Sequence, residues 1–127
     1  MKIYLDDRRA IPEGWAGARN SGEFKALIAR ATTEKINIEA IAFDHDLGEF
    51  DEAGAEITGH TLVKWLGENY PEYIINSEIT SHSDDYDGRK NIEGYVKTCK
   101  EHPEELLTAR EREYPFGEIE REQRKNK

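Results

Sequence analysis

The sequence has little cysteine and no long hydrophobic run, and each absence excludes a class of protein. Its single cysteine, Cys99, cannot form a disulfide within the chain, which favours a reducing compartment. No segment approaches the roughly 20 apolar residues of a membrane-spanning helix. Asp6 and Asp7 stand near the start, where a signal peptide would be apolar. We therefore expect a cytoplasmic protein with no membrane partner.

Positive charge is also scarce. The chain has 18 basic and 27 acidic residues, which give a formal net charge of −9, whereas phosphate backbones attract basic proteins. A protein that coats nucleic acid is therefore disfavoured. The net charge does not exclude an enzyme that binds a phosphate group through a bound cation, because a divalent ion inverts the local charge.

The hydrophobic core must be small and concentrated in a few segments. Only 36% of the 127 residues are apolar, and the mean hydropathy is −0.87. These segments predict strands at 2–5, 15–19, 36–43 and 73–80, with a loop at 8–14 after the first. Apolar spacing and capping residues predict helices that begin at Ser21, Thr58 and about Gly88. The second is expected to end near Pro71 and the third at Pro103. Glu49–Ile57 is acidic and indicates a surface loop or a small hairpin.

The alternation of strands and helices indicates the fold class. It predicts an α/β protein, a small flavodoxin-like domain of three layers with a mostly parallel sheet of about four strands. The domain is expected to span residues 1–102. Residues 103–127 are strongly charged and are expected to form an extension that is partly helical or frayed.

Polar clusters follow three of the predicted strands. They are Asp6-Asp7, Asp44-His45-Asp46 and Ser81-His82-Ser83. Ligands of parallel α/β sheets bind outside the carboxyl ends of the strands, so these clusters are expected to converge in space.

Asp6, Asp7 and Asp44 together predict a metal site. Three carboxylates on one rim repel each other, and they offer the hard oxygen ligands that Mg²⁺ or Mn²⁺ prefers. The alternative is structural, with Asp6 or Asp7 capping the turn that follows. Arg8 and Arg9 come next and either bind an anionic substrate or neutralise the carboxylates.

The last cluster supplies a candidate acid or base. His82 could be a general acid or base, because histidine is the residue most often used for proton transfer, although a hydrogen bond to a loop carbonyl would explain this histidine equally well. Ser83 could donate to a phosphoryl oxygen or cap the next helix. Arg89 opens that helix beside free backbone N–H groups, where an anion could bind.

Several motifs together resemble one known family. They are Leu5-Asp-Asp-Arg8, Pro12-Glu-Gly-Trp15, Phe43-Asp-His-Asp-Leu-Gly48, Thr58-Gly59 with Trp65, and His82-Ser83 with Gly88 and Asn91. From Lys2 to about Val96 the chain resembles the cyclic-phosphate processing receiver-like domains of prokaryotes and phages, which are related to the receivers of two-component signalling.

The resemblance implies roles for the acidic residues. Asp6 and Asp7 match the metal-binding acidic pair of receivers, and Asp44 matches the aspartate that receivers phosphorylate. The family implies activity on cyclic phosphate ends. Two departures bear on the mechanism, because no strand after Val96 carries a receiver's lysine, and His82 stands where receivers usually have Thr or Ser.

The first hypothesis is therefore a Mg²⁺-dependent hydrolase, whose substrate is an RNA 2′,3′-cyclic phosphate end or a small cyclic nucleotide. Asp44 would bind metal, with Asp44 itself or a metal-bound water as nucleophile, and His82 would protonate the leaving oxygen. Arg8 and Ser83 would steady the phosphate. The alternatives are a signalling module phosphorylated on Asp44, and a binding scaffold whose acidic cluster is neutralised by Arg8, Arg9 and Arg89. The sequence leaves the oligomeric state open.

Overall fold

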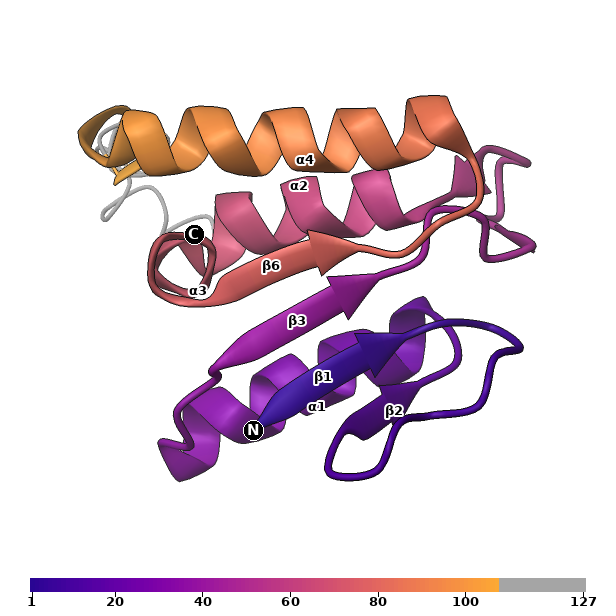
Figure 1. Cartoon of the computed structure of the whole chain (residues 1–127), viewed down its shortest axis with the longest axis horizontal. Coiled ribbons are helices and arrows are strands. Elements are labelled where there is room, and N and C mark those ends of the chain that lie inside the picture. The colour runs from indigo at the N-terminus through magenta and orange to yellow at the C-terminus, as the bar shows by residue number, and fades with distance from the viewer. Residues whose placement is uncertain (108–127) are drawn as a thin grey trace.

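The computed structural model describes residues 1–107 and contains a four-stranded parallel sheet (Figure 1). Its strands are β1 (Lys2–Leu5), β2 (Ala16–Ala18), β3 (Ala40–Phe43) and β6 (Glu78–Ser81), in the order β2-β1-β3-β6. The short strands β4 (Glu49–Phe50) and β5 (Glu56–Ile57) form a separate antiparallel hairpin. The predicted α/β class and four-stranded parallel sheet are confirmed.

Four helices lie within residues 1–107, and a side chain caps the start of the first, the second and the fourth. They are α1 (Ser21–Glu34), α2 (Gly59–Asn69), α3 (Pro71–Asn76) and α4 (Tyr86–Glu101). The side chain of Asn20 accepts a hydrogen bond from the N–H of Glu23, so Asn20 caps α1 in place of the predicted Ser21. Thr58 caps α2 as predicted, in a reciprocal capping box with Thr61.

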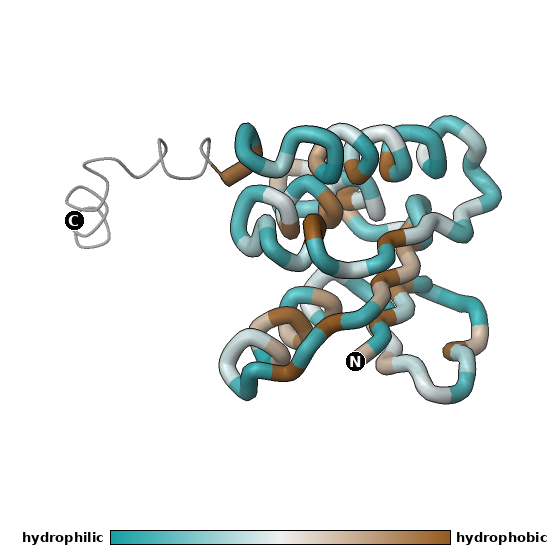
Figure 2. The backbone as a smooth tube through the Cα atoms, turned by 60° about the vertical axis from the view of Figure 1, so that its left-hand side comes forward, coloured by the Kyte–Doolittle hydropathy of each residue, from teal (hydrophilic) through white to brown (hydrophobic). Residues whose placement is uncertain are grey.

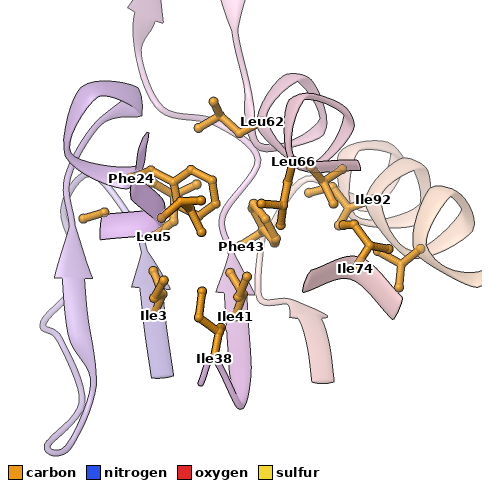
Figure 3. Close-up of a cluster of buried hydrophobic side chains, with 14 of the residues drawn as sticks. Ile3, Leu5, Phe24, Ile38, Ile41, Phe43, Leu62, Leu66, Ile74 and Ile92 are labelled. Atoms are coloured by element: carbon orange, nitrogen blue, oxygen red, sulfur yellow. The ribbon is translucent and has the colours of Figure 1, made fainter. Parts of the chain in front are cut away.

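The core lies on one side of the sheet. Successive strand residues point to opposite sides, and Ile3 and Phe43 are fully buried on the same side. They pack in one cluster with Phe24 of α1 and Leu66 of α2 (Figure 3). Both helices therefore cover the same face of the sheet.

No described helix covers the other side, which we call the open face. By strand register it carries Lys2, Tyr4, Ala40, Ala42, Glu78 and Thr80. Lys2, Glu78 and Thr80 are exposed, and Figure 1 looks onto this face, where no helix lies in front of the strands. Over residues 1–107 the domain thus has two layers instead of the three expected.

The topology explains the open face. The crossovers from β2 to β3 and from β3 to β6 run in the same direction along the sheet, so right-handed connections place α1 and α2 on the same side. The connection from β1 to β2 is the predicted loop and contains no helix. A parallel sheet is usually covered on both faces, so this exposure is unusual.

Two strand boundaries predicted from the sequence were wrong. The segment 73–80 begins as helix α3, and only Glu78–Ser81 is strand, because Pro71 starts a helix that buries Ile74. The segment 36–43 is strand only from Ala40, because the N–H of Ile36 still bonds to the end of α1. Short apolar runs do not distinguish a buried strand from a short helix.

Most of the predicted C-terminal extension lies outside the described residues. Within the described part, Leu106 packs against the core and Leu107 is exposed. Hydrophobic residues are interspersed along α4 among the hydrophilic residues that dominate it (Figure 2). None of the helices within residues 1–107 is both long and apolar enough to cross a bilayer.

Candidate functional site

Asp6, Asp44 and His82 each follow directly after a strand and lie side by side. The N–H of Asp44 bonds to the carbonyl of Leu5, and the N–H of His82 bonds to that of Phe43, both at 3.0 Å, so the ladders of the sheet continue through these residues. The three residues therefore form one row of the pleated sheet. One ligand atom from each lies within 4.8 Å of the other two.

Asp6 is completely buried, and its carboxylate holds the loop that follows β1. Its Oδ1 accepts the backbone N–H groups of Arg8 and Arg9 at 2.9 and 2.8 Å. Its Oδ2 accepts Nη1 of Arg9 at 2.8 Å and bonds to Nε2 of His82 at 2.9 Å. Asp6 thus caps the turn, which was the structural alternative, and also belongs to the cluster.

The two buried carboxylates have opposite pKa shifts. Burial acts to raise the pKa of Asp6, but hydrogen bonds from the backbone of Arg9 and Arg8 and from the side chains of Arg9 and His82 outweigh it, so this pKa lies well below its usual range. Burial raises the pKa of Asp44, and repulsion from Asp6 raises it further. Opposite charges on His82 and Arg9 offset only part of that rise.

Arg9 is the cation of the cluster. Its Nη1 lies 3.8 Å from Oδ1 of Asp44, and its Nη2 bonds to Asp84 at 2.9 Å. Arg19 holds the same loop, with its Nη1 donating to the backbone carbonyls of Asp6 and Arg9 at 3.1 and 2.6 Å. Sequence reasoning did not single out Arg19, because nothing in the pattern separates it from the other surface arginines.

Arg8 and Asp7 lie outside this cluster. The side chain of Arg8 is exposed, and only its backbone N–H reaches Asp6. Asp7 is half-buried, and its Oδ1 is a buried atom with no hydrogen-bond partner among the described residues. Its Oδ2 lies 3.8 Å from where a Cβ on Gly48 would stand, so Asp7 faces the loop after β3.

His82 is held between an aromatic ring and a carboxylate. Its ring stacks on Tyr4 with centroids 4.4 Å apart and planes 6° from parallel. Nε2 faces Asp6, whereas Nδ1 is buried and has no partner among the described residues. The carboxylate that orients His82 is therefore that of Asp6.

Ser83 and Arg89 lie in the turn that leads into α4. Ser83 is buried, and its hydroxyl accepts the N–H of Asp85 at 3.0 Å. Nη1 of Arg89 donates to the carbonyl of Ser83 at 3.1 Å. These contacts stabilise the turn, and they do not bring either side chain to the Asp6–Asp44–His82 cluster.

His45 forms a second group on the other side of Asp44. Its Nδ1 lies 3.1 Å from Asp46 and 3.4 Å from Asp85, and its ring packs against Gly88. The backbone N–H of His45 donates to Oδ1 of Asp44 at 2.9 Å. His45 therefore fixes the Asp44 carboxylate through its backbone, while its ring points elsewhere.

The buried position of Asp6 leads to a pH prediction. Asp6→Asn places an amide N–H₂ against the donors of Arg9 and His82, and we expect it to lower the free energy of unfolding at pH 7 by about 3 kcal/mol. The pKa of Asp6 is lower in the folded protein than its value of about 3.9 in the unfolded chain, so the ionised carboxylate stabilises the folded state above that pH. This stabilisation is lost as pH falls below about 3.9 toward the folded pKa. In urea unfolding at several pH values, the gap between wild type and variant should narrow from about pH 5 to pH 2.

Asp84→Asn is the matched control. Asp84 is also a partner of Arg9, but the side chain of Asp84 is 83% exposed. It should change stability by less than about 0.5 kcal/mol at every pH. Equal effects of the two substitutions would contradict the assignment of Asp6 as the buried anchor.

One of the comparisons with known proteins gives a match. A family model described as the cyclic-phosphate processing receiver domain matches residues 1–98, which include the whole cluster. No curated protein and no solved structure matches the chain.

Proposed function

The chain belongs to the cyclic-phosphate processing receiver domain family, and we propose that its Asp6–Asp44–His82 site hydrolyses a cyclic phosphate with a divalent cation. The observation that carries the proposal is the row of two carboxylates and one imidazole, within 4.8 Å, at the carboxyl ends of three parallel strands. A guanidinium beside them suits a phosphate anion.

The donor set fits Mg²⁺ or Mn²⁺. Oδ1 of Asp7 is a buried acceptor without a partner among the described residues, and Oδ2 of Asp44 receives no hydrogen bond from them. Asp6 already accepts four hydrogen bonds. We therefore assign Asp7 and Asp44 as direct ligands of the cation, and Asp6 would contact the cation through a bound water molecule. When bound, such a cation polarises a phosphoryl oxygen and activates water.

His82 and Arg9 act on the substrate in this proposal. Water adds its oxygen to phosphorus and releases a proton to solvent, and one P–O bond to the ribose breaks. His82 gives the leaving oxygen a proton from Nε2, which is the ring nitrogen that faces the cluster. Arg9 steadies the phosphate, which is the role first considered for Arg8. Ser83 and Arg89 then contribute by holding the turn that carries His82.

A binding module without turnover is the second candidate. It is favoured by Arg9, which contacts Asp6 at 2.8 Å and lies 3.8 Å from Asp44, so that the cluster is partly neutralised by the chain itself. Phosphorylation of Asp44 in signalling has less support. Within residues 1–107 no strand follows α4, so none carries a receiver-type lysine there.

The test combines thermal unfolding with a hydrolysis assay. Millimolar Mg²⁺ or Mn²⁺ should raise Tm by several degrees, because a ligand at 100 times its Kd stabilises the folded state by about 2.7 kcal/mol. Adenosine 2′,3′-cyclic phosphate should be opened to a monophosphate, followed by ³¹P NMR. Sodium chloride at equal ionic strength is the control. No metal-dependent shift and no hydrolysis would move the assignment to the binding module.

A further inference from the structure

The ring of Tyr4 lies in direct contact with the imidazole of His82. Tyr4 is on the open face of β1, two residues before Asp6, and the sequence analysis did not single it out. The two rings are stacked, with centroids 4.4 Å apart and planes 6° from parallel. The proposed hydrolysis gives His82 the role of acid and gives Tyr4 none.

The two ring nitrogens of His82 are held unequally. Nε2 lies 2.9 Å from Oδ2 of Asp6, whereas Nδ1 is buried and has no hydrogen-bond partner among residues 1–107. A histidine that transfers a proton through one ring nitrogen is usually oriented by a hydrogen bond at the other. Within the described part of the chain His82 has no such bond, so its orientation depends on other contacts.

The contact with Asp6 alone does not fix the imidazole. It restrains the position of Nε2 but leaves the plane of the ring free to turn, because the outer side-chain torsion of histidine is broad. A flat stack restrains that plane. The backbone of His82 is fixed as well, because its N–H bonds to the carbonyl of Phe43 at 3.0 Å. Together the strand, the stack and Asp6 leave the imidazole one orientation.

The sheet has room for the two rings to meet. β3 lies between β1 and β6, so the imidazole must pass over β3 to reach Tyr4 (Figure 1). In the row of Tyr4, β3 carries Ala42, whose methyl group is short enough to lie beneath a ring. Ala42 is only 5% exposed although no described helix covers this face, so neighbouring side chains cover it.

Trp15 supports Tyr4 from the side of β2. The rings of Tyr4 and Trp15 meet edge to face, with centroids 5.8 Å apart and planes at 81°. Nζ of Lys2 lies 5.8 Å from the centroid of the Trp15 ring, at cation–π distance. These contacts restrict the ring of Tyr4, which therefore offers His82 a fixed surface.

We propose that Tyr4 is a positioning residue of the site, whose ring holds the imidazole of His82 with Nε2 directed at Asp6 and at the substrate. The inference rests on the proposed function and deepens it, because it names the residue that orients the acid. We assign this role to the aromatic ring, since the hydroxyl of Tyr4 has no hydrogen-bond partner among the described residues.

The kinetic test compares Tyr4→Leu and Tyr4→Phe with wild type on adenosine 2′,3′-cyclic phosphate. Tyr4→Leu should lower kcat about 10- to 100-fold and change KM by less than about twofold, because a misplaced acid weakens the transition state and not substrate binding. Tyr4→Phe keeps the ring and should restore the wild-type rate. The matched control is Tyr73→Leu. Tyr73 is a half-buried tyrosine of α3 that stacks on Tyr70, and its loss should lower stability without lowering kcat.

A double substitution separates a positioning role from a general structural one. If Tyr4 acts through His82, adding Tyr4→Leu to His82→Gln should lower kcat little further, so the two losses should not add. Losses that add would show that Tyr4→Leu damages the site in another way and would overturn the inference. So would a Tyr4→Phe variant as slow as Tyr4→Leu, because the hydroxyl would then be the acting group.

The orientation of His82 can also be measured without turnover. At alkaline pH, long-range ¹H–¹⁵N NMR should show the neutral imidazole as one tautomer, with its proton on Nε2, in wild type and Tyr4→Phe, and as a mixture in Tyr4→Leu. The signals of His82 are identified by their loss in His82→Gln. If this pattern appears in a protein that hydrolyses nothing, Tyr4 orients His82 and the hydrolytic function fails. A mixture in wild type, or one tautomer in all three proteins, would overturn the inference.

Discussion

Asp44→Asn should abolish hydrolysis of the cyclic phosphate while leaving the protein folded. The substitution removes one carboxylate oxygen that we assign to the cation, and losses at such positions are typically 100-fold or more in kcat. The same variant should lose the rise in Tm with Mg²⁺. The rate is measured by ³¹P NMR, and the Tm by circular dichroism with and without the metal.

Without metal, the Asp44→Asn variant should be more stable than wild type at pH 7. Burial and the charge of Asp6 raise the pKa of Asp44, so the folded state disfavours its ionised form. Because the pKa of Asp44 is higher in the folded protein than its value of about 3.9 in the unfolded chain, the protonated carboxyl favours the folded state at low pH. This contribution to stability is lost as pH rises through the folded pKa. The advantage of the variant should therefore be absent at low pH and grow as pH rises.

Asp46→Asn is the matched control for Asp44→Asn. Asp46 stands two positions along, its side chain is 61% exposed, and its contact is with His45. We expect wild-type rates and an unchanged metal shift. Hydrolysis retained in Asp44→Asn would remove Asp44 from the reaction. Labelling of wild type by a small phosphodonor, lost in the variant and without hydrolysis, would favour the signalling alternative.

Gly59→Ala should be the most destabilising single methyl addition near the site. A Cβ at Gly59, where α2 begins, would overlap the backbone carbonyl oxygen of Asp44 and come within 3.1 Å of the Cα of His45. Backbone cannot rotate away as a side chain can, so we expect a loss of about 3 kcal/mol and a Tm lower by about 10–15 °C. Because the strain falls on Asp44, kcat should fall as well.

Gly94→Ala provides the control for Gly59→Ala. Gly94 lies inside α4, and a Cβ there would meet nothing within 4 Å. Alanine is the better helix former, so this variant should gain about 1 kcal/mol in urea unfolding with unchanged activity. A Gly59→Ala protein as stable as wild type would show that the loop after β3 moves freely from α2, contrary to the tight approach in the structure.

Much of the sheet could be predicted because its signals are local. Lys2–Leu5 and Ala40–Phe43 combine apolar residues with a polar break after each strand. Thr58 could be recognised in the sequence as a capping residue, whereas its partner Thr61 appeared only in the structure. Helix α3 could not be predicted, because its six residues are too few for a helical period to appear.

The candidate site was also only partly predictable from the sequence. The polar strand ends indicated that Asp6, Asp44 and His82 would meet, since parallel strands bring their carboxyl ends to one edge. The sequence did not indicate which arginine turns inward. Arg8 and Arg9 are adjacent and chemically identical, and only the turn held by Asp6 directs Arg9 to the carboxylates.

The sequence by itself determined the class of fold, the strand ends that carry the polar clusters, and the residue types available for binding a metal and a phosphate. These follow from periodicity, capping and charge, which act over a few residues. Only the tertiary structure decided that Asp6 pairs with His82, that Asp7 faces the loop after β3, and that no described helix covers one face of the sheet. Those outcomes depend on register and crossover direction, which join residues as far apart as Asp6 and His82, and no local pattern specifies them.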